Sequence, residues 1–294
     1  MFAKCAQDKY GKYIQMDLSK KKIVIAGCGQ NIRPYIHRVF KNIYTIARLF
    51  NDYKIVIFEN DSIDNTLEIL NSYEKKDPNM ILFTERNIPV PKYLHPCRIA
   101  YCRNRLLEKI NASFADYDFM VMLDLDDVCA APIQIHHFMN IFKNKVWDSV
   151  SFNREEYYDK WALRYPPFMK NCWNFAKRNE CFRYTRKLGH HITHLLKNND
   201  MVPVLSAFNG FAIYKIDKIK GCIYDGRNKE RPLGNRTRHM QDCEHVAFHR
   251  AMMEKNNARH FISSLILFSQ SVDTSIWNMP ENSQPSLMSK IIIT

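Results

Sequence analysis

The sequence has little glycine, no long apolar run and no paired cysteine motif, and each absence excludes a class of protein. Only 8 of the 294 residues are glycine, which excludes a collagenous chain and a glycine-rich linker. No apolar run approaches the length of a membrane-spanning helix, and residues 1–22 lack the apolar stretch of a signal peptide. The 9 cysteines include no C-x-x-C pair, which favours reduced thiols over a disulfide framework or a zinc site. We therefore expect a cytoplasmic protein.

The composition is that of a globular protein with a basic surface. Hydrophobic residues make up 46% of the chain and aromatic residues 13%, enough for the core of one large domain. The net charge is +13, and much of it is local: Lys160 to Lys197 contains nine Lys or Arg residues and one acidic residue, Glu180. Such a segment suits phosphates, an anionic membrane surface or nucleic acid, and it is also typical of a solvated surface. We expect peripheral membrane contact through residues 160–197 and no nucleic-acid partner.

In the first half of the chain, β-branched and apolar runs alternate with stretches of helical spacing. Strands are predicted at residues 21–29, 53–58, 80–84 and 119–123, with helices at 33–50, after 62 and at 97–110. This βαβ rhythm is typical of a parallel sheet with helices on its faces. Because ligands bind at the carboxyl ends of the strands in such sheets, we expect the functional residues directly after the strands.

The second half is less regular. The predicted elements are a strand at 148–152, a strand at 204–214, a helix at 242–255 and a strand at 260–268. Residues 154–200 are aromatic and basic and show no clean period. Asn209 and Gly210 interrupt the second of these strands, and a polar tail follows from residue 278.

The segment 120–128 places three carboxylates at the end of a buried strand. Asp124 and Asp126 are two residues apart, so they point to the same side of an extended chain. Two close carboxylates repel each other unless a cation joins them, and a hard divalent ion that also binds diphosphate oxygens supplies that charge. The structural alternative is that Asp126 or Asp127 caps a helix before Pro132. Three acids exceed what a cap requires, which favours the metal site.

The pattern Asp124-x-Asp126 after a hydrophobic strand resembles the D-x-D motif of GT-A glycosyltransferases. Three upstream segments resemble the family-2-type transferases of this group: VIAGCGQN at 24–31, IVIFENDSIDNT at 55–66 and CRIAYCRN at 97–104. They occur in the family's order, and the likeness of the second half of the chain is looser. The resemblance implies an α/β GT-A fold, a Rossmann-like, mostly parallel central sheet flanked by helices.

The resemblance also implies a domain plan and a reaction. One GT-A domain covers residues 1–294, with a nucleotide-sugar-binding half at 21–130, an acceptor-binding half at 145–270 and a tail at 278–294. The implied reaction moves a sugar from a nucleoside-diphosphate sugar to a hydroxyl of a glycan or a lipid-linked (glycolipid) acceptor. A divalent ion, Mn²⁺ or Mg²⁺, neutralises the charge that grows on the leaving diphosphate. Whether the enzyme inverts or retains the anomeric configuration stays open.

The residues implied to contact the donor come from both halves of the chain. They are Gly27, Cys28, Glu59, Asn60, Arg98, Arg103, Asp124, Asn209 and Gly210. Asn60 stands where the family usually has an aspartate that binds the base, so the base stays open. Arginine suits phosphate or base edges, and pairing of Arg98 and Arg103 with surface acids is the alternative. Asn209 and Gly210 either bring backbone close to the ligand or form an ordinary hairpin turn.

Segment 240–252 has acids at a predicted helix start, where inverting GT-A enzymes carry the catalytic base. Asp242 or Glu244 matches that position, and helix capping is the alternative role for both. The implied metal ligands are Asp124 and Asp126, with His245 as the candidate third ligand, although isolated histidines are more often structural. The acids and aromatic residues of 155–164 suit sugar binding, and core packing explains them equally well.

Two other functions fit parts of the sequence. LDLDDV at 123–128 resembles the signature of haloacid-dehalogenase-type phosphatases, with Asp124 as the nucleophile. However, three βα units precede it and no later GD-x-x-x-D follows. The basic stretch 160–197 fits a nucleic-acid-binding module, but it has no RRM, zinc-finger or helix-turn-helix signature. The sequence therefore predicts a metal-dependent glycosyltransferase.

Overall fold

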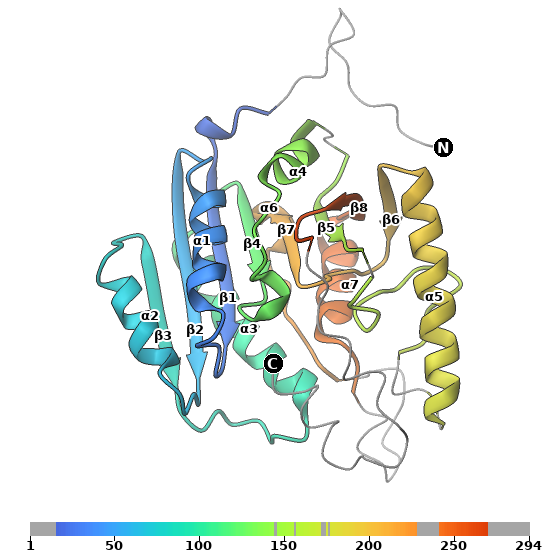
Figure 1. Cartoon of the computed structure of the whole chain (residues 1–294), viewed down its shortest axis with the longest axis horizontal. Helices are drawn as coiled ribbons and strands as arrows, with labels where there is room; N and C mark the ends of the chain where they lie inside the picture. The colour runs from blue at the N-terminus through green and yellow to red at the C-terminus, as the bar shows by residue number, and fades with distance from the viewer. Residues whose placement is uncertain are drawn as a thin grey trace, which may run out of the picture.

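The computed structural model of the chain describes residues 16–143, 146–155, 157–171, 175, 177–227 and 241–269. The predicted tail at 278–294 lies outside these ranges, as do Cys5 and Cys172. A sheet of eight strands runs through the described part, and helices cover both of its faces (Figure 1).

The sheet has the strand order β3-β2-β1-β4-β7-β5-β8-β6. Its strands are β1 (Lys22–Gly29), β2 (Asp52–Asn60), β3 (Met80–Glu85), β4 (Phe119–Leu123), β5 (Ser149–Asn153), β6 (Met201–Val204), β7 (Phe211–Lys215) and β8 (His260–Ile266). The first four strands are parallel to one another, as are β5 and β8, whereas β6 and β7 are antiparallel to their neighbours. The sheet is mostly parallel, which confirms the predicted α/β class.

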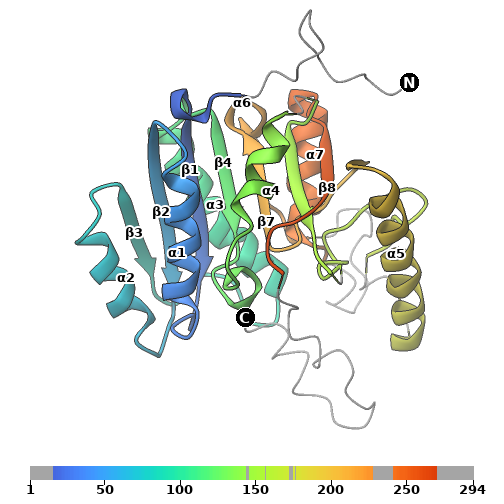
Figure 2. The same ribbon diagram turned by 45° about the horizontal axis from the view of Figure 1, so that its top comes forward.

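The helices form two layers, one on each side of the sheet, apart from α5, which lies at one edge (Figure 2). They are α1 (Ile36–Ala47), α2 (Thr66–Glu74), α3 (His95–Ser113), α4 (Ile135–Asn140), α5 (Arg178–Asn198), α6 (Ile216–Ile219) and α7 (Glu244–Asn256). Short 3₁₀ turns occur at η1 (Leu18–Lys20), η2 (Asp127–Cys129) and η3 (Ile141–Lys143). Helices α1, α2 and α4 bury their apolar sides on one face, and α3, α6 and α7 on the other.

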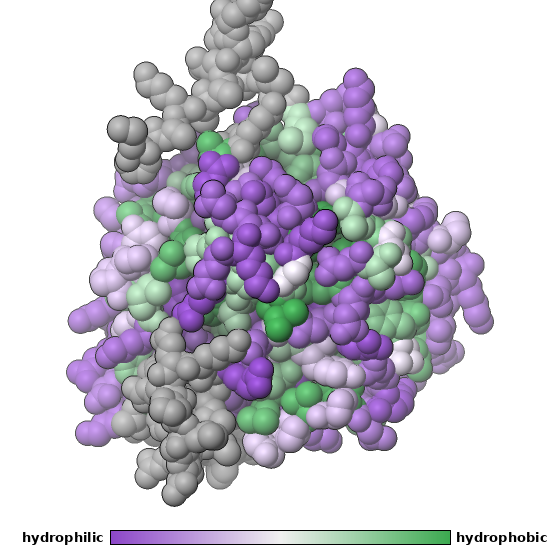
Figure 3. All heavy atoms as spheres, turned by 180° about the vertical axis from the view of Figure 1, so that it is seen from behind, coloured by the Kyte–Doolittle hydropathy of each residue, from purple (hydrophilic) through white to green (hydrophobic). Residues whose placement is uncertain are grey.

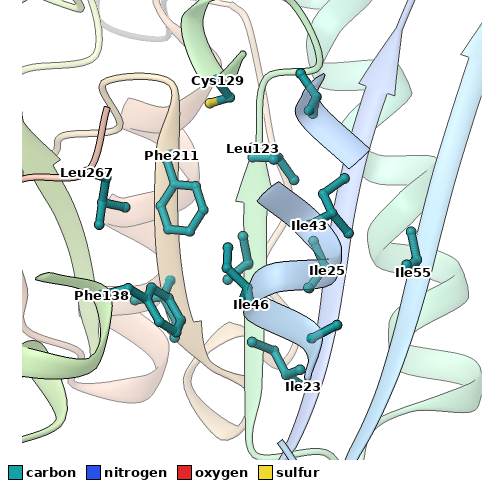
Figure 4. Close-up of a cluster of buried hydrophobic side chains, with 14 of the residues drawn as sticks. Ile23, Ile25, Ile43, Ile46, Ile55, Leu123, Cys129, Phe138, Phe211 and Leu267 are labelled. Carbon is teal, nitrogen blue, oxygen red and sulfur yellow. The ribbon is translucent and has the colours of Figure 1, made fainter. Parts of the chain in front are cut away.

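The alternation of side chains along β1 explains why its sequence is continuously apolar. Ile23 and Ile25 belong to the core under α1, whereas Val24 and Ala26 belong to the core under α3. Figure 4 shows Ile43 of α1 in the first of these cores, beside Ile25. A strand that is buried on both faces has no polar side, so it appears in the sequence as an unbroken apolar run.

The outer surface of the helical layer seen from behind is mainly hydrophilic, with smaller hydrophobic areas between (Figure 3). Among the described residues, no helix combines the length and the apolar character that crossing a bilayer requires.

The expectation of one strand over residues 204–214 is wrong. The segment holds the end of β6 and most of β7, which are not neighbours: β6 pairs with β8, and β7 lies between β4 and β5. Asn209 and Gly210 have positive φ angles of 59° and 83°, and they redirect the chain into β7. An apolar run shows that its residues are buried, but it does not show which strands they pair with.

The sequence also gave no indication of α5, which lies in the stretch that shows no clean period. Leu188, Ile192 and Leu196 recur every four residues and pack in a third apolar core with Val202 of β6 and Ile262 of β8. The basic and aromatic residues between them mask this narrow apolar stripe. Because α5 packs along one edge, few apolar positions are enough to hold it.

Candidate active site

The carboxyl ends of β1, β2 and β4 meet at a cavity of about 1220 Å³. The strands end here because polar or turn-forming residues follow each apolar run, as at Asp61 after β2. Eight of the predicted site residues line this one cavity: Cys28, Asn60, Arg98, Arg103, Asp124, Asp126, Glu244 and His245. Residues as far apart in sequence as Cys28 and His245 therefore share one wall.

Five predicted site residues do not line the cavity: Gly27, Glu59, Asn209, Gly210 and Asp242. A Cβ at Gly27 would lie 2.8 Å from Cδ2 of Leu125, so this glycine provides room for the loop after β4. The fully buried Glu59 accepts a hydrogen bond from the backbone N–H of Ser62 at 2.8 Å, within the turn that follows β2.

Asn209 and Gly210 do not line the cavity, but they hydrogen-bond to segments that do. The Oδ1 atom of Asn209 accepts hydrogen bonds from the backbone N–H groups of Tyr158 (3.2 Å) and Asp159 (3.0 Å). The carbonyl of Gly210 accepts from the N–H of Asp124 at 2.9 Å, and a Cβ at Gly210 would lie 2.2 Å from Cγ1 of Val128. The pair does not form a hairpin turn, because β6 and β7 do not pair with each other.

A buried arginine joins the two halves of the site. Arg103 of α3 is 5% exposed, and its Nη2 donates to Oδ1 of Asp124 at 3.0 Å. Its Nη1 donates to the carboxylate of Glu244, and it lies 2.5 Å from Nε2 of His245. The guanidinium also lies 4.7 Å from the ring centre of Phe208. The partners of Arg103 are therefore cavity residues, not the surface acids considered as an alternative.

The carboxylates that line the cavity have too little positive charge nearby to offset the loss of hydration on burial. Burial raises the pKa of Asp124 and of Glu244 to about 6 each, although Arg103 acts in the opposite direction on both. Burial and the neighbouring Asp124 also raise the pKa of Asp126 well above its ordinary value. Asp124 and Asp126, which gain too little compensating positive charge, suit a hard divalent cation, whose ligands are oxygens.

The Asp126 side chain also has a structural role. It accepts a hydrogen bond from the N–H of Val128 at 3.1 Å and so caps η2, the structural role considered as an alternative. Asp126 also lines the cavity, so this one side chain both caps η2 and faces the candidate site. In the described ranges, no three His, Cys, Asp or Glu side chains surround a common cation position.

His245 and Asp242 lie on either side of Glu244 in different surroundings. The His245 ring stacks on Phe208 with ring centres 3.8 Å apart, and burial followed by the nearby Arg103 lowers its pKa well below the ordinary value. Its Nε2 faces Arg103, so it is a neutral hydrogen-bond acceptor in this arrangement. Asp242 lies outside the cavity and pairs with Arg164, 2.5 Å between Oδ1 and Nη2.

Two acids that the sequence motifs did not single out, Asp61 and Asp159, also line the cavity. Asp61 accepts from the N–H of Asn87 at 2.6 Å and lies 3.3 Å from Nη2 of Arg98. Asp159 accepts from the N–H groups of Ala162 (3.0 Å) and Asn209 (3.3 Å), and burial raises its pKa. The only sequence signal for Asp159 was its place in the acidic and aromatic segment 155–164, where Tyr158 and Trp161 also line the cavity.

The fold and this cavity define an α/β protein whose candidate ligand site lies at the carboxyl ends of its parallel strands. The chain belongs to the family of cryptococcal mannosyltransferase 1, whose sequence profile matches residues 22–267. This membership confirms the resemblance to glycosyltransferases and not the resemblance to haloacid-dehalogenase-type phosphatases. No curated protein sequence matches the chain significantly.

Solved structures with low sequence identity resemble the chain. A mannosyltransferase from Pyrobaculum calidifontis, in complex with GDP-Man and Mn²⁺, is 13% identical with a TM-score of 0.42 over 84% of this chain and 58% of that one. Residues 1–349 of TarS from S. aureus are 13% identical with a TM-score of 0.46, over 92% and 69%. Glucosyl-3-phosphoglycerate synthase from Mycobacterium tuberculosis, with Mn²⁺, UDP and phosphoglyceric acid, is 10% identical with a TM-score of 0.44, over 93% and 76%. The chain thus spans less than two thirds of the length of the Pyrobaculum enzyme.

Proposed function

We propose that this chain transfers a mannosyl group from a nucleoside-diphosphate mannose to an acceptor hydroxyl. One observation carries the proposal: the buried Arg103 joins Asp124, at the end of β4, to Glu244, at the start of α7, in the wall of a single cavity. A transferase needs a group that holds the donor and a group that activates the acceptor within reach of one reacting carbon. The choice of mannose is supported by the family to which the chain belongs.

The nucleotide would occupy the part of the cavity near β1 and β2. Cys28 and Asn60 line it there, and the guanidinium of Arg98 is held in place by the carbonyl of Val90 at 2.6 Å and by Asp61. A guanidinium fixed in this way offers its remaining N–H groups to phosphate or base edges. Asp61 adds a carboxylate acceptor for base N–H groups, so the cavity suits recognition of a base as well as of phosphates.

A divalent ion would be held by Asp124 and Asp126. Their chemistry fits Mn²⁺ or Mg²⁺, because both are carboxylates, both line the cavity, and burial raises the pKa of both. When bound, such an ion neutralises the negative charge that develops on the leaving diphosphate. Asp124 also accepts from Arg103, which fixes the direction of its carboxylate relative to the cavity.

Glu244 is the better of the two predicted candidates for the general base. Its carboxylate lines the cavity at the start of α7, and its pKa, raised by burial to about 6, lies near neutrality, where proton acceptance is efficient. Asp242 is paired with Arg164 and lies outside the cavity, so it would hold the loop before α7. The base would take the proton of the acceptor hydroxyl as that oxygen attacks the sugar.

Asp159 and its aromatic neighbours would contact the transferred sugar. The Asp159 carboxylate is fixed by two backbone N–H groups, and Tyr158 and Trp161 flank it in the cavity lining. A sugar ring presents hydroxyl groups around its edge and C–H groups on its faces, which suit a carboxylate and aromatic rings respectively. The acceptor, a hydroxyl of a glycan or of a lipid-linked molecule, would approach from the side of Glu244.

The proposal is tested with the purified full chain, Mn²⁺ and a panel of donors. GDP-mannose, UDP-glucose and UDP-N-acetylglucosamine are supplied in turn with mannoside and glycolipid acceptors, and the products are read by mass spectrometry. We expect transfer of mannose, with release of the nucleoside diphosphate. Transfer of a different sugar would overturn the choice of mannose alone, whereas failure of every nucleotide to raise the thermal unfolding midpoint would overturn the assignment of the cavity.

A further inference from the structure

Helix α5 lies at one edge of the molecule, beside β6, with one side against the protein (Figures 1 and 2). It is 21 residues long and is held by Leu188, Ile192 and Leu196. Gly189 lies on the same side, where a Cβ would come within 3.0 Å of Cε of Lys160. The helix therefore packs directly against the segment that contributes Tyr158, Asp159 and Trp161 to the cavity wall.

The opposite side of α5 is a continuous basic face. Its exposed residues are Arg183, Arg186, Lys187, His190, His194 and Lys197. They recur every three or four residues, so they form one stripe along the helix, about 21 Å long at a rise of 1.5 Å per residue. The helix contains a single acidic residue, Glu180, so almost nothing on α5 itself offsets this charge.

Two exposed apolar side chains lie near the N-terminal end of α5. Phe182 is 37% exposed and Met169 is 45% exposed. The loop that carries Met169 is held to the helix by Phe168, whose ring lies 5.6 Å from that of Tyr184 and 5.5 Å from that of His191. The guanidinium of Arg178 lies 5.0 Å from the ring centre of Phe182, so basic and apolar groups are adjacent here.

We propose that this face of α5, together with Phe182 and Met169, docks on an anionic phospholipid surface. The basic stripe is complementary to acidic headgroups, and the two apolar side chains suit insertion at the boundary between headgroups and acyl chains. A single-stranded RNA would use the same charges and would stack a base on Phe182, but only a bilayer would also bury the exposed Met169. The contact of α5 with the cavity segment would present the active site to acceptors held in that membrane.

The strength of such docking is set mainly by the number of basic side chains at the surface. Each Lys or Arg near an anionic bilayer strengthens binding by roughly fivefold, so loss of three weakens it by roughly 100-fold. Removal of the Phe182 ring should weaken it by a further, salt-independent factor of roughly five. The proposal concerns binding alone, so its failure and the failure of the mannosyltransferase proposal are separate results.

The test is sedimentation of the full chain with phosphatidylcholine vesicles, with and without phosphatidylserine. The wild-type protein should sediment only with the phosphatidylserine vesicles, and less so at high salt. R183Q/R186Q/K187Q should lose roughly 100-fold in affinity, and F182S roughly fivefold. Circular dichroism of each variant confirms that it is folded, which is expected because glutamine is a good helix former.

A matched variant separates a specific face from net charge. K41Q/K75Q/K76Q removes three exposed lysines at α1 and the end of α2, toward the β3 edge of the sheet and away from α5 (Figure 1), and should bind as the wild type does. Equal losses in the two triple variants would overturn the proposal, as would an absence of binding to the anionic vesicles. Binding to a single-stranded RNA oligonucleotide but not to vesicles would also overturn it, and would assign the stripe to nucleic acid.

Discussion

Arg103 donates from Nη2 to Oδ1 of Asp124 at 3.0 Å, and this contact joins helix α3 to the loop that follows β4. The same guanidinium reaches Glu244, which lies 141 residues further along the chain. One buried cation therefore sets the spacing between the proposed donor site and the proposed base. The first prediction follows from this arrangement.

Arg103→Met should destabilise the protein by about 3–5 kcal/mol, because it leaves the buried Glu244 and the partly buried Asp124 without their shared cation. Urea unfolding followed by circular dichroism measures the loss. Arg48→Met, an exposed arginine at the end of α1, is the control and should change stability by less than about 0.5 kcal/mol. Equal effects of the two substitutions would show that the ion pairs of Arg103 with Asp124 and Glu244 do not stabilise the folded protein.

Asp126→Asn should reduce activity by more than about 100-fold, because a metal-bound diphosphate leaving group is worth several kcal/mol of transition-state stabilisation. The asparagine can still cap η2, so the folded structure should persist. Asp127→Asn is the matched control, since Asp127 is the adjacent acid and does not line the cavity. Full turnover of the wild type in excess EDTA would contradict the metal requirement.

Glu244→Gln should lower kcat by about 10²–10⁴-fold with little change in donor affinity, because the glutamine keeps the size of the side chain and loses its basicity. Asp242→Asn should have a much smaller effect on kcat, since Asp242 lies outside the cavity. Steady-state kinetics of both variants at saturating donor decides between them. A larger effect from Asp242 would reassign the base.

Asp159→Asn should weaken use of the sugar donor by about 10-fold to 100-fold in kcat/KM, because a hydrogen bond to a charged group contributes about 1.5–3 kcal/mol. Binding of the nucleoside diphosphate without its sugar should be unchanged. Calorimetry with the diphosphate and kinetics with the complete donor separate the two effects. If the affinity for the diphosphate and kcat/KM for the complete donor fall together, Asp159 holds the segment 155–164 in place instead of binding the sugar.

The pH dependence of stability should reveal the buried His260. Burial lowers the pKa of His260 to about 4, whereas in the unfolded chain it is near 6.5, so only the unfolded chain binds this proton between these values. The contribution to stability is complete above pH 6.5 and is lost as the pH falls toward 4, by about 1.4 kcal/mol per pH unit. The stability advantage of the wild type over His260→Gln should shrink accordingly in urea unfolding from pH 7.5 to 5.

The control for this experiment is His190→Gln, an exposed histidine of α5. It measures how loss of a solvent-exposed imidazole alone changes stability over the same pH range. The variants must be compared with the wild type, because buried acids such as Glu244, whose pKa is raised to about 6, make the folded protein more stable as the pH falls and so oppose the effect of His260 on total stability. A constant difference for His260→Gln would show that the pKa of this imidazole is the same in the folded and the unfolded protein.

The sequence by itself determined the first half of the fold and the position of its carboxylates. The runs that became β1, β2, β3 and β4 are apolar on both faces, and the polar residues that follow them mark the sheet edge where Asn60 and Asp124 lie. Periodicity and strand ends are local properties, so they can be identified without knowledge of the neighbouring elements. The sequence also placed Glu244 at a helix start, which α7 confirms.

Only the tertiary structure decided which of the predicted site residues share the cavity. It placed Glu244 beside Arg103 and Asp242 beside Arg164, although both acids fit the same motif position. It also separated β6 from β7, and it assigned Gly27 to packing against Leu125. These outcomes depend on the order of strands in the sheet and on contacts between residues far apart in the chain. The free energy of those contacts comes from burial and ion pairing across elements, and no local pattern of residues records it.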